Sequence, residues 1–497
     1  MNIYVPLMNK LFKNSFIFIL VLSFFNCAED LYEVPDNLIV HDFVWKGLNA
    51  YYLHQDKITD LSDRRFNSDN ELNAYLNTFT NYNLLFSNLL ITNDNKSSLV
   101  EDYNTIVDPE LRAAFTNGLE FGLLKEQDSD TIIGYVLDIL PLSYASTQII
   151  SRGDYFSAVV DSDNDTINLT KKNYEDLLLN YNQDTLKLVM VDYDGIDVSP
   201  NSKKSELVKR SYTHNPISFE STFLSDGNTI GYLMYNNDFS KNYITDLNNT
   251  ILSFKNQNIN QLILDLRYNI GSGGYVENIK KIAAMITGQF TDNIFLKEEW
   301  NVKAQPWFLA NQPDSLLTKF PSKLNSTTTI NSLNLTDVYI VLNGSNFTGS
   351  STVELLINSL KPYINVHIIG TQTSGNNTGS ITLYNSEDYD FLLRNETHTT
   401  ALQPEVLRFF NKDDQTYENG FTANLSICPN EDILNLGVLG EITDPILNNV
   451  LNYISTGNNG ANSNCNPNNF EFIYNSINAQ REVDKGVFIK QDLPNTN

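Results

Sequence analysis

The spacing of apolar residues divides the first 200 residues into two regions. Between about residues 40 and 100, large apolar residues stand three and four apart, as in HDFVWKGLNAYYL and ELNAYLNTF, and this period predicts helices. Between about residues 108 and 200, short apolar runs alternate with Gly, Pro, Asp and Asn. This second pattern predicts a small β domain, with a helix at KKNYEDLLLNY.

From about residue 218 to 455, predicted strands and helices alternate. The strand-forming runs are GYLMYN, LILDLRYN, VYIVLN and VHIIGT, and the predicted helices are GYVENIKKIAAMITG and STVELLINSLK. Alternation of this kind predicts an α/β domain with a mainly parallel sheet. Sites in such sheets form in loops beyond the carboxyl ends of strands. The loops in LDLRYNIGSGG and IVLNGSNFTGSS are therefore the places where chemistry is expected.

The two ends of the chain differ from its middle. Lys10 and Lys13 precede an apolar run, Ser15–Phe25, which is shorter than the roughly 20 residues that span a bilayer and fits a signal peptide. Cys27 follows and resembles the lipid-modified residue of a bacterial lipoprotein, although Asn26 stands where a small residue is usual. The alternative is an ordinary signal peptide with an incidental cysteine. At the other end, residues 456–497 are rich in Gly and Asn, and a flexible tail is expected.

Composition excludes several classes of function. With 41% hydrophobic and 19% charged residues, the chain is that of a folded protein, and 497 residues suffice for about three domains. A net charge of −26 argues against nucleic acid as a partner, because phosphate binding needs concentrated Lys and Arg. Histidines and cysteines lack metal-ligand spacing, and no Gly-Lys-Ser/Thr follows the Gly-rich loop, so no metal or other cofactor is expected. The spacing of Cys428 and Cys465 leaves a disulfide between them open.

Ser351 begins the clearest candidate for chemistry. Ser351-Thr352-Val353-Glu354 has the form of a capping box, in which the serine only caps a helix and the glutamate reaches back to its N–H. A serine at a helix N-terminus is equally well placed for catalysis, because the helix dipole and free N–H groups stabilise an oxyanion. Position alone leaves both interpretations open.

Motifs in a fixed order resolve this choice. LILDLRYNIGSGG, VYIVLNGSNFTGSSTVELLINSLKPY and VHIIGTQTSGNNTGS, with NGFTANLSI and LNLGVLGEITDP later, resemble the tail-specific, or C-terminal processing, serine protease family. The resemblance runs from about Asp42 to Ile454 and is strongest to lipoprotein members from Bacteroidetes; CAED after the signal also resembles their surface-export signal. It implies an α+β multidomain protein in the cell envelope, anchored in the outer membrane through Cys27 and facing the periplasm or the surface. The implied parts are a lipoprotein signal peptide (1–27), a helical N-terminal domain (28–107), a PDZ-like β domain (108–200), a ClpP/crotonase-like α/β protease domain (210–455) and the tail.

The PDZ resemblance implies a peptide-binding element at Phe121, Gly122 and Leu123. In PDZ domains a peptide adds as an extra strand, and backbone N–H groups near the first turn hold its carboxylate. These three residues are expected to form that turn. The alternative is a β domain that merely packs.

The family resemblance also assigns a nucleophile and an oxyanion hole. The family's nucleophile stands three residues before a glutamate, which gives Ser351, or Ser350 if the loop carries one extra residue. N–H groups of the Gly-rich loop and of the residue after the serine form the oxyanion hole. The candidates are Gly271, Gly273, Gly274 and Thr352.

The general base does not match the family pattern. The family uses a lysine 25 residues after the serine, and that position is Asn376; a slip of one residue gives Asn377. An amide has no basic lone pair and accepts no proton from a serine. The family's supporting glutamine corresponds to Ser380. Lys361 lies about 15 Å along the same helix at 1.5 Å per residue, which excludes it.

Two classes of function follow. The first is a serine endopeptidase that acts on protein or peptide tails. The second is a catalytically impaired relative that binds extended peptides or protein C-termini, because losing a member of such a catalytic unit costs on the order of 10⁴ to 10⁶ in rate. A histidine could replace the lysine, but the sequence places none of the five beside Ser351. They are His41, His54, His214, His367 and His398.

Overall fold

The structure is a computed structural model of the whole chain. It describes residues 34–105, 113–126, 129–180, 183–213, 215–236, 239, 243–269, 274–342, 350–428, 431–458, 470–481 and 486–489. The signal region and Cys27 lie outside these residues. Within them, no helix combines the length and apolar character that crossing a bilayer requires.

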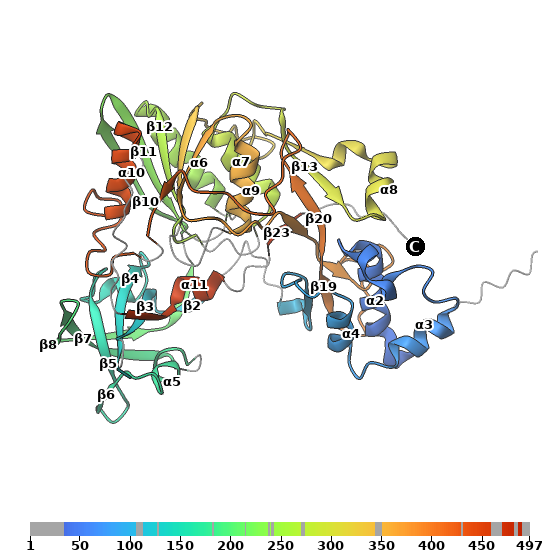
Figure 1. Cartoon of the computed structure of the whole chain (residues 1–497), viewed down its shortest axis with the longest axis horizontal. Coiled ribbons are helices and arrows are strands. Elements are labelled where there is room, and N and C mark those ends of the chain that lie inside the picture. The colour runs from blue at the N-terminus through green and yellow to red at the C-terminus, as the bar shows by residue number, and fades with distance from the viewer. Residues whose placement is uncertain are drawn as a thin grey trace, which may run out of the picture.

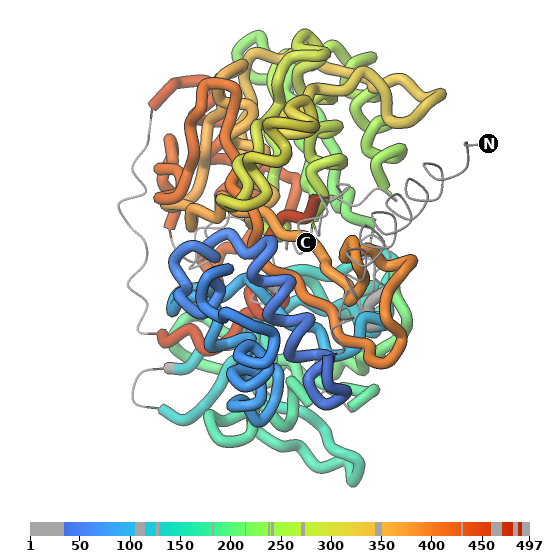
Figure 2. Tube along the Cα trace, turned by 90° about the vertical axis from the view of Figure 1, so that its right-hand side faces the viewer, coloured from blue at the N-terminus to red at the C-terminus, as the bar shows by residue number. Residues whose placement is uncertain are grey.

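The N-terminal helices form as their apolar spacing predicts, but they do not have a core of their own. Their large apolar residues, among them Tyr51 and Tyr52, are fully buried in the same hydrophobic core as Phe295 and Phe409 of the α/β domain. In Figure 2 these helices, drawn in blue, lie across the middle of the molecule against the orange segment. The elements are α2 (Ile39–Tyr51), α3 (Asp69–Leu76), α4 (Tyr82–Asn88) and β1 (Ser98–Val100), which pairs with β19 (Ala401–Gln403).

The β domain predicted between 108 and 200 is a sheet in the order β22-β3-β4-β5-β7-β8, with β6 beside β5. It extends past residue 200, because β8 runs to Val208 and β9 pairs with β2. Figure 1 shows this sheet below the α/β domain. Its elements are β2 (Ala113–Thr116), β3 (Leu119–Glu126), β4 (Ile132–Ile139), β5 (Tyr155–Val160), β6 (Thr166–Asn168), α5 (Tyr174–Leu178), β7 (Thr185–Tyr193), β8 (Val198–Val208) and β9 (Arg210–Thr213).

The expected turn at Phe121, Gly122 and Leu123 is wrong. All three lie inside β3, where successive side chains alternate between the faces and Leu123 is fully buried. The turn lies a few residues earlier: Gly118 has a left-handed φ of +86°, and the side chain of Asn117 accepts a hydrogen bond from the N–H of Leu119.

The α/β domain is built as the alternation of strands and helices predicts. Its first sheet has the order β10-β11-β12-β15-β16-β21, in which β10 is antiparallel to β11 and the other neighbours are parallel. A second sheet has the order β14-β13-β20-β17-β23. The strands are β10 (Ile217–Ser225), β11 (Asn228–Tyr235), β12 (Gln261–Asp265), β13 (Ile294–Trp300), β14 (Leu317–Lys319), β15 (Asp337–Val341), β16 (Asn365–Gly370), β17 (Thr378–Ser380), β18 (Leu383–Tyr384), β20 (Glu405–Phe410) and β21 (Leu425–Ser426).

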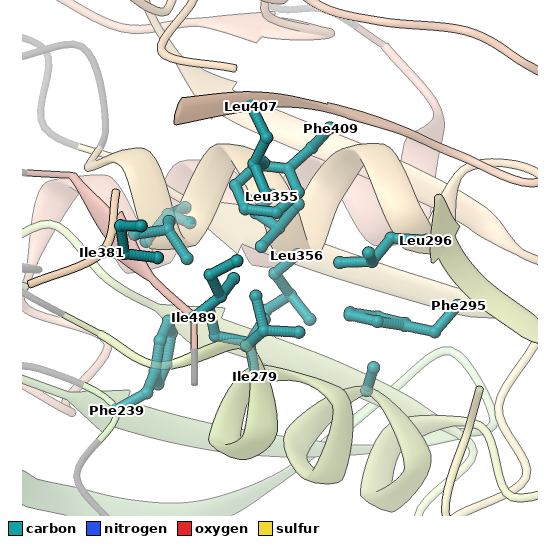
Figure 3. Close-up of a cluster of buried hydrophobic side chains, with 14 of the residues drawn as sticks. Phe239, Ile279, Phe295, Leu296, Leu355, Leu356, Ile381, Leu407, Phe409 and Ile489 are labelled. Carbon is teal, nitrogen blue, oxygen red and sulfur yellow. The ribbon is translucent and has the colours of Figure 1, made fainter. Parts of the chain in front are cut away.

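Several helices border these sheets, and one of them is central. They include α6 (Ile244–Asn256), α7 (Val276–Ile286), α8 (Ala304–Asn311), α9 (Ser351–Leu360) and α10 (Pro445–Thr456). Every residue of α9 is buried. Figure 3 shows Leu355 and Leu356 of this helix between Ile279 of α7 and Leu407 and Phe409 of β20. Packing on all sides fixes the start of α9, and this is where the candidate nucleophile lies.

The expectation of a flexible tail after residue 456 is wrong for part of the tail. Helix α10 (Pro445–Thr456) is followed by β22 (Phe470–Asn475), α11 (Ser476–Arg481) and β23 (Val487–Phe488). Strand β22 pairs with β3, and β23 pairs with β17. Just after β21, Cys428 is disulfide-bonded, while Cys465 lies outside the described residues.

Candidate active site at the start of α9

The serine that caps α9 is Ser350, not Ser351. The Ser350 hydroxyl lies 3.4 Å from the N–H of Val353, 3.2 Å from the Asn269 side-chain oxygen and 2.9 Å from the hydroxyl of Thr352. The capping box expected at Ser351 is therefore wrong by one residue. The hydroxyl of Ser350 is fully engaged in holding the helix start to the loop after β12.

Ser351 is the first residue of α9 and is 2% exposed. Among the described residues, its hydroxyl has no hydrogen-bond partner. A side chain added at Gly486 would place its Cβ 4.0 Å from this hydroxyl, so the backbone of the C-terminal segment passes directly in front of it. Ser351 thus combines the free N–H groups of a helix N-terminus with an uncommitted hydroxyl.

The loop after β12 is anchored by a buried charge cluster. Arg267 is 1% exposed and lies 2.7 Å from the carboxylate of Asp265 and 2.5 Å from that of Asp444. The hydroxyl of Tyr232 donates to Asp265 at 2.9 Å. Burial opposes the charge of Arg267, but the two carboxylates outweigh burial and raise its pKa. This cluster fixes the backbone that leads to Asn269 and the Gly-rich loop.

A second cluster joins the same loop to the β domain. Arg152 pairs with Glu431, and its guanidinium donates to the hydroxyl of Tyr268 at 2.5 Å. The Tyr268 hydroxyl donates in turn to Glu431 at 2.8 Å. Burial opposes the ionisation of Glu431, but the charges of Arg152 and Arg267 outweigh it and lower the pKa of the carboxyl. The sequence predicts neither cluster, because Arg267 and Asp444 are 177 residues apart and Arg152 lies 116 and 279 residues from its two partners.

Two of the residues predicted for the oxyanion hole, Gly274 and Thr352, are in contact. Thr352 is fully buried, and a side chain at Gly274 would place its Cβ 2.3 Å from the Thr352 methyl group. The absence of a side chain therefore lets the Gly-rich loop touch the start of α9. Gly271 and Gly273 lie outside the described residues.

The turn that carries Asn376 is held by Glu354, one helical turn after Ser351. The Glu354 carboxylate accepts the N–H groups of Gly375 and Asn376, each at 2.7 Å. Burial raises the pKa of Glu354, and these N–H groups partly offset the effect. Gly375 has a φ of +91°, and a Cβ there would lie 2.2 Å from the carbonyl oxygen of Glu418. The turn that carries Asn376 is thus built tightly.

Two further side chains near Asn376 have partners of their own. The side chain of Asn377 is buried and donates to Thr416 at 2.7 Å. Lys96, which the sequence did not single out, lies 3.2 Å from the hydroxyl of Thr378, two residues past Asn376. It also forms an ion pair with the carboxylate of Glu405, at 3.4 Å.

The described histidines have their contacts elsewhere. His367 stacks on Tyr339 and lies 3.2 Å from Asp337, at the amino-terminal end of β15 and far from the start of α9. The partners of the others are Tyr82 for His41, Tyr52 for His54, and Asn385 and Phe43 for His398. His214 lies outside the described residues. Within the described part of the chain, no group of His, Cys, Asp and Glu could hold a metal ion.

These features define an α/β protein with a serine at a helix N-terminus, at the carboxyl ends of parallel strands. Residues 229–427 match the model of peptidase family S41. The resemblance seen in the sequence is thereby confirmed. The match supports a serine-type hydrolase.

One solved structure shares this fold, and a second is less similar. A protein from Bacteroides fragilis NCTC 9343, named as a candidate S41 protease, is 20% identical with a TM-score of 0.63, covering 86% of this chain and 99% of that one. The photosystem II D1 C-terminal processing protease is 15% identical with a TM-score of 0.44, covering 80% and 95%. No curated protein matches the sequence.

Proposed function

We propose that this protein is a serine endopeptidase of the C-terminal processing kind that acts on protein or peptide tails, with Ser351 as the nucleophile. The observation that carries the proposal is the different roles of the two serines: Ser350 caps α9, whereas the hydroxyl of Ser351 bonds to no described group. The next residue, Thr352, contacts Gly274. N–H groups at this position are suited to stabilise a tetrahedral oxyanion.

We further propose that turnover is slow. An oxyanion hole and substrate binding without a base leave roughly 10³ over the uncatalysed rate, and the amide of Asn376 accepts no proton from the serine. The second candidate function is therefore peptide binding without cleavage. The observation that favours it is Asn376, in a turn whose backbone Glu354 holds in place.

Reaction of the full chain with a fluorophosphonate probe tests the nucleophile. We expect slow labelling that Ser351→Ala abolishes and Ser350→Ala retains, because only an activated serine reacts. Labelling that survives Ser351→Ala would assign the nucleophile to another residue. Complete absence of labelling, with peptide binding intact, would favour the second candidate function.

The β domain is proposed to bind peptides in the manner of a PDZ domain. Support comes from β3, whose edge already pairs with another strand of the chain, β22, at Gly122 and Leu123, while the N–H of Phe121 bonds to Ser476. If a carboxylate is held next to this edge, a peptide with a free C-terminus should bind better than its amidated twin. Equal affinities across varied peptides would remove this part of the proposal.

The location is proposed from the sequence. We propose that Cys27 is the lipid-modified first residue of the mature protein, which anchors the protein in the cell envelope. Cys27→Ser should release the protein from the membrane fraction. Unchanged fractionation would leave an ordinary signal peptide as the explanation.

A further inference from the structure

The C-terminal segment at residues 486–489 lies where a substrate strand would lie. Phe488 donates its N–H to the carbonyl of Gly274 at 3.0 Å, and Ile489 donates to the carbonyl of Ser380 at 3.2 Å. On one side the segment pairs in parallel with Gly379 and Ser380 of β17, and on the other it bridges to Tyr275. Both backbone edges of the segment are therefore paired in a channel that begins in front of Ser351.

The side chains of the segment alternate as in any extended strand. Val487 is fully buried and Ile489 is 8% exposed, and both belong to the hydrophobic core. Figure 3 shows Ile489 between Ile279 and Ile381. Phe488, the residue between them, lies against the ring of Tyr275 at 6.2 Å and is 7% exposed. Phe488 and Ile489 both line a cavity of about 570 Å³. The channel thus takes apolar side chains, and space remains beside two of them.

The preceding part of the same segment occupies the edge of β3. Strand β22 pairs antiparallel with β3, and the hydroxyl of Ser476 in α11 accepts the N–H of Phe121 at 2.9 Å. Gln480, also in α11, donates to Glu120 at 3.0 Å. One segment therefore covers both the peptide edge of the β domain and the approach to Ser351. Figure 1 shows α11 beside β3, and β23 in the centre of the molecule.

We propose that residues 486–489 are a built-in peptide ligand of the site, tethered from the β3 edge by β22 and α11. The channel between Gly274 and β17 binds an extended peptide with apolar side chains at alternate positions, and a peptide in trans enters only after this segment has left. The inference rests on the proposed function for its relevance to substrates. It does not require that the protein hydrolyse anything.

Binding of a labelled peptide to the full chain tests the proposal. The probe is EVDKGVFIKQ, the sequence of residues 482–491, with a fluorophore at its amino end. The releasing variant is Val487→Asp/Ile489→Asp, because buried carboxylates in the apolar face expel the strand. The matched control is Leu142→Asp/Leu392→Asp, which adds the same charges at side chains that are 96% and 83% exposed.

We expect the releasing variant to bind the peptide at least tenfold tighter than the unaltered protein and the control variant, because a tethered ligand competes at an effective concentration on the order of mM. A peptide with Asp in place of its Val and Ile should not bind. Equal binding by the unaltered and releasing proteins would overturn the proposal. If the releasing variant folds cooperatively but does not bind the peptide, the proposal is also overturned, and the segment is a permanent part of the sheet.

Hydrogen exchange on the unaltered protein keeps the proposal testable if the releasing variant does not fold. The N–H groups of Phe488 and Ile489 should exchange before those of Leu264 and Ile340 in the central sheet, because the segment opens without global unfolding. Exchange together with the central sheet would overturn it. Peptide binding to the releasing variant, with Ser351 inert to the fluorophosphonate, would instead leave this inference standing and reject the peptidase function.

Discussion

The start of α9 and the turn that carries Asn376 are both held by hydrogen bonds, but they differ in the chemistry of the side chains that they present. At the start of α9, hydrogen bonds among Ser350, Asn269 and Thr352 hold the helix. The hydroxyl of Ser351 faces the C-terminal segment at Gly486. At the turn through residues 373–377, the Glu354 carboxylate accepts two backbone N–H groups and so fixes the backbone as well. The first half presents a nucleophile, whereas the second presents an amide that accepts no proton. The backbones of both halves are therefore held firmly, although their side chains differ in chemistry.

A lysine in place of Asn376 should have the largest effect, because it would give the second half a basic side chain. Asn376→Lys should raise peptide hydrolysis by roughly 10² or more, within the range of general-base catalysis. A lysine there must lose its proton near neutral pH, which desolvation favours. Hydrolysis of casein or a fluorogenic peptide measures the gain, and adding Ser351→Ala should abolish it. Robust hydrolysis by the unaltered protein would mean that another base serves.

Removing the carboxylate between the two halves should have the next largest effect. Glu354→Ala leaves two N–H groups without their acceptor and should lower the free energy of unfolding by about 2 kcal/mol. It should also abolish the hydrolysis gained through Asn376→Lys. Glu354→Gln keeps one acceptor and should lose about half as much in urea unfolding. The exposed Glu418→Ala serves as the control, and an equal loss there would contradict the assignment.

A second buried carboxyl, that of Glu298, should make the stability of the protein depend on pH. Burial raises the pKa of Glu298 in β13 to about 8 from its ordinary 4.5. Between these two values the folded state keeps a proton that the unfolded state releases, so stability falls as pH rises. Between pH 6 and 7.5, the unaltered protein should lose roughly 1 kcal/mol per pH unit more than Glu298→Gln. Parallel pH profiles for the two proteins would mean that the carboxyl is already ionised.

The smallest effect should separate the two serines. Ser350→Ala removes a helix cap and should lower the free energy of unfolding by about 1 kcal/mol. Ser351→Ala should leave stability within about 0.5 kcal/mol, because its hydroxyl bonds to no described group. Thermal unfolding of the two variants measures this contrast. If Ser351→Ala lowered stability more than Ser350→Ala, Ser351 would be the helix cap.

Local pattern was enough to predict much of this protein. The alternation of strands and helices gave the parallel sheet and α9, since apolar periodicity reports which face of each element is buried. The start of α9 was misplaced by one residue because Ser350 and Ser351 are both good caps, and only the contact with Asn269 distinguishes them. FEFIYN does carry a strand pattern, but a Gly- and Asn-rich stretch before it concealed β22.

What the sequence could not supply are contacts between distant segments. Lys96 meets Thr378 across 282 residues, and Arg152 meets Glu431 across 279. Charged residues are common on surfaces, so nothing in their neighbourhoods marks them as partners. The same holds for GVFI at residues 486–489, which is too short to predict a strand without the edges that receive it.

The shared core of the N-terminal helices also bears on how the chain folds. The N–H of Leu53 bonds to the carbonyl of Glu405, and Asn301 bonds to the carbonyls of Ala50 and Tyr52. These partners are synthesised hundreds of residues after α2. Until then, the apolar face of the helix has none of these partners to pack against. Such high contact order slows folding and exposes the nascent chain to aggregation. The N-terminal helices therefore complete their packing only after the strands of the second sheet have been synthesised.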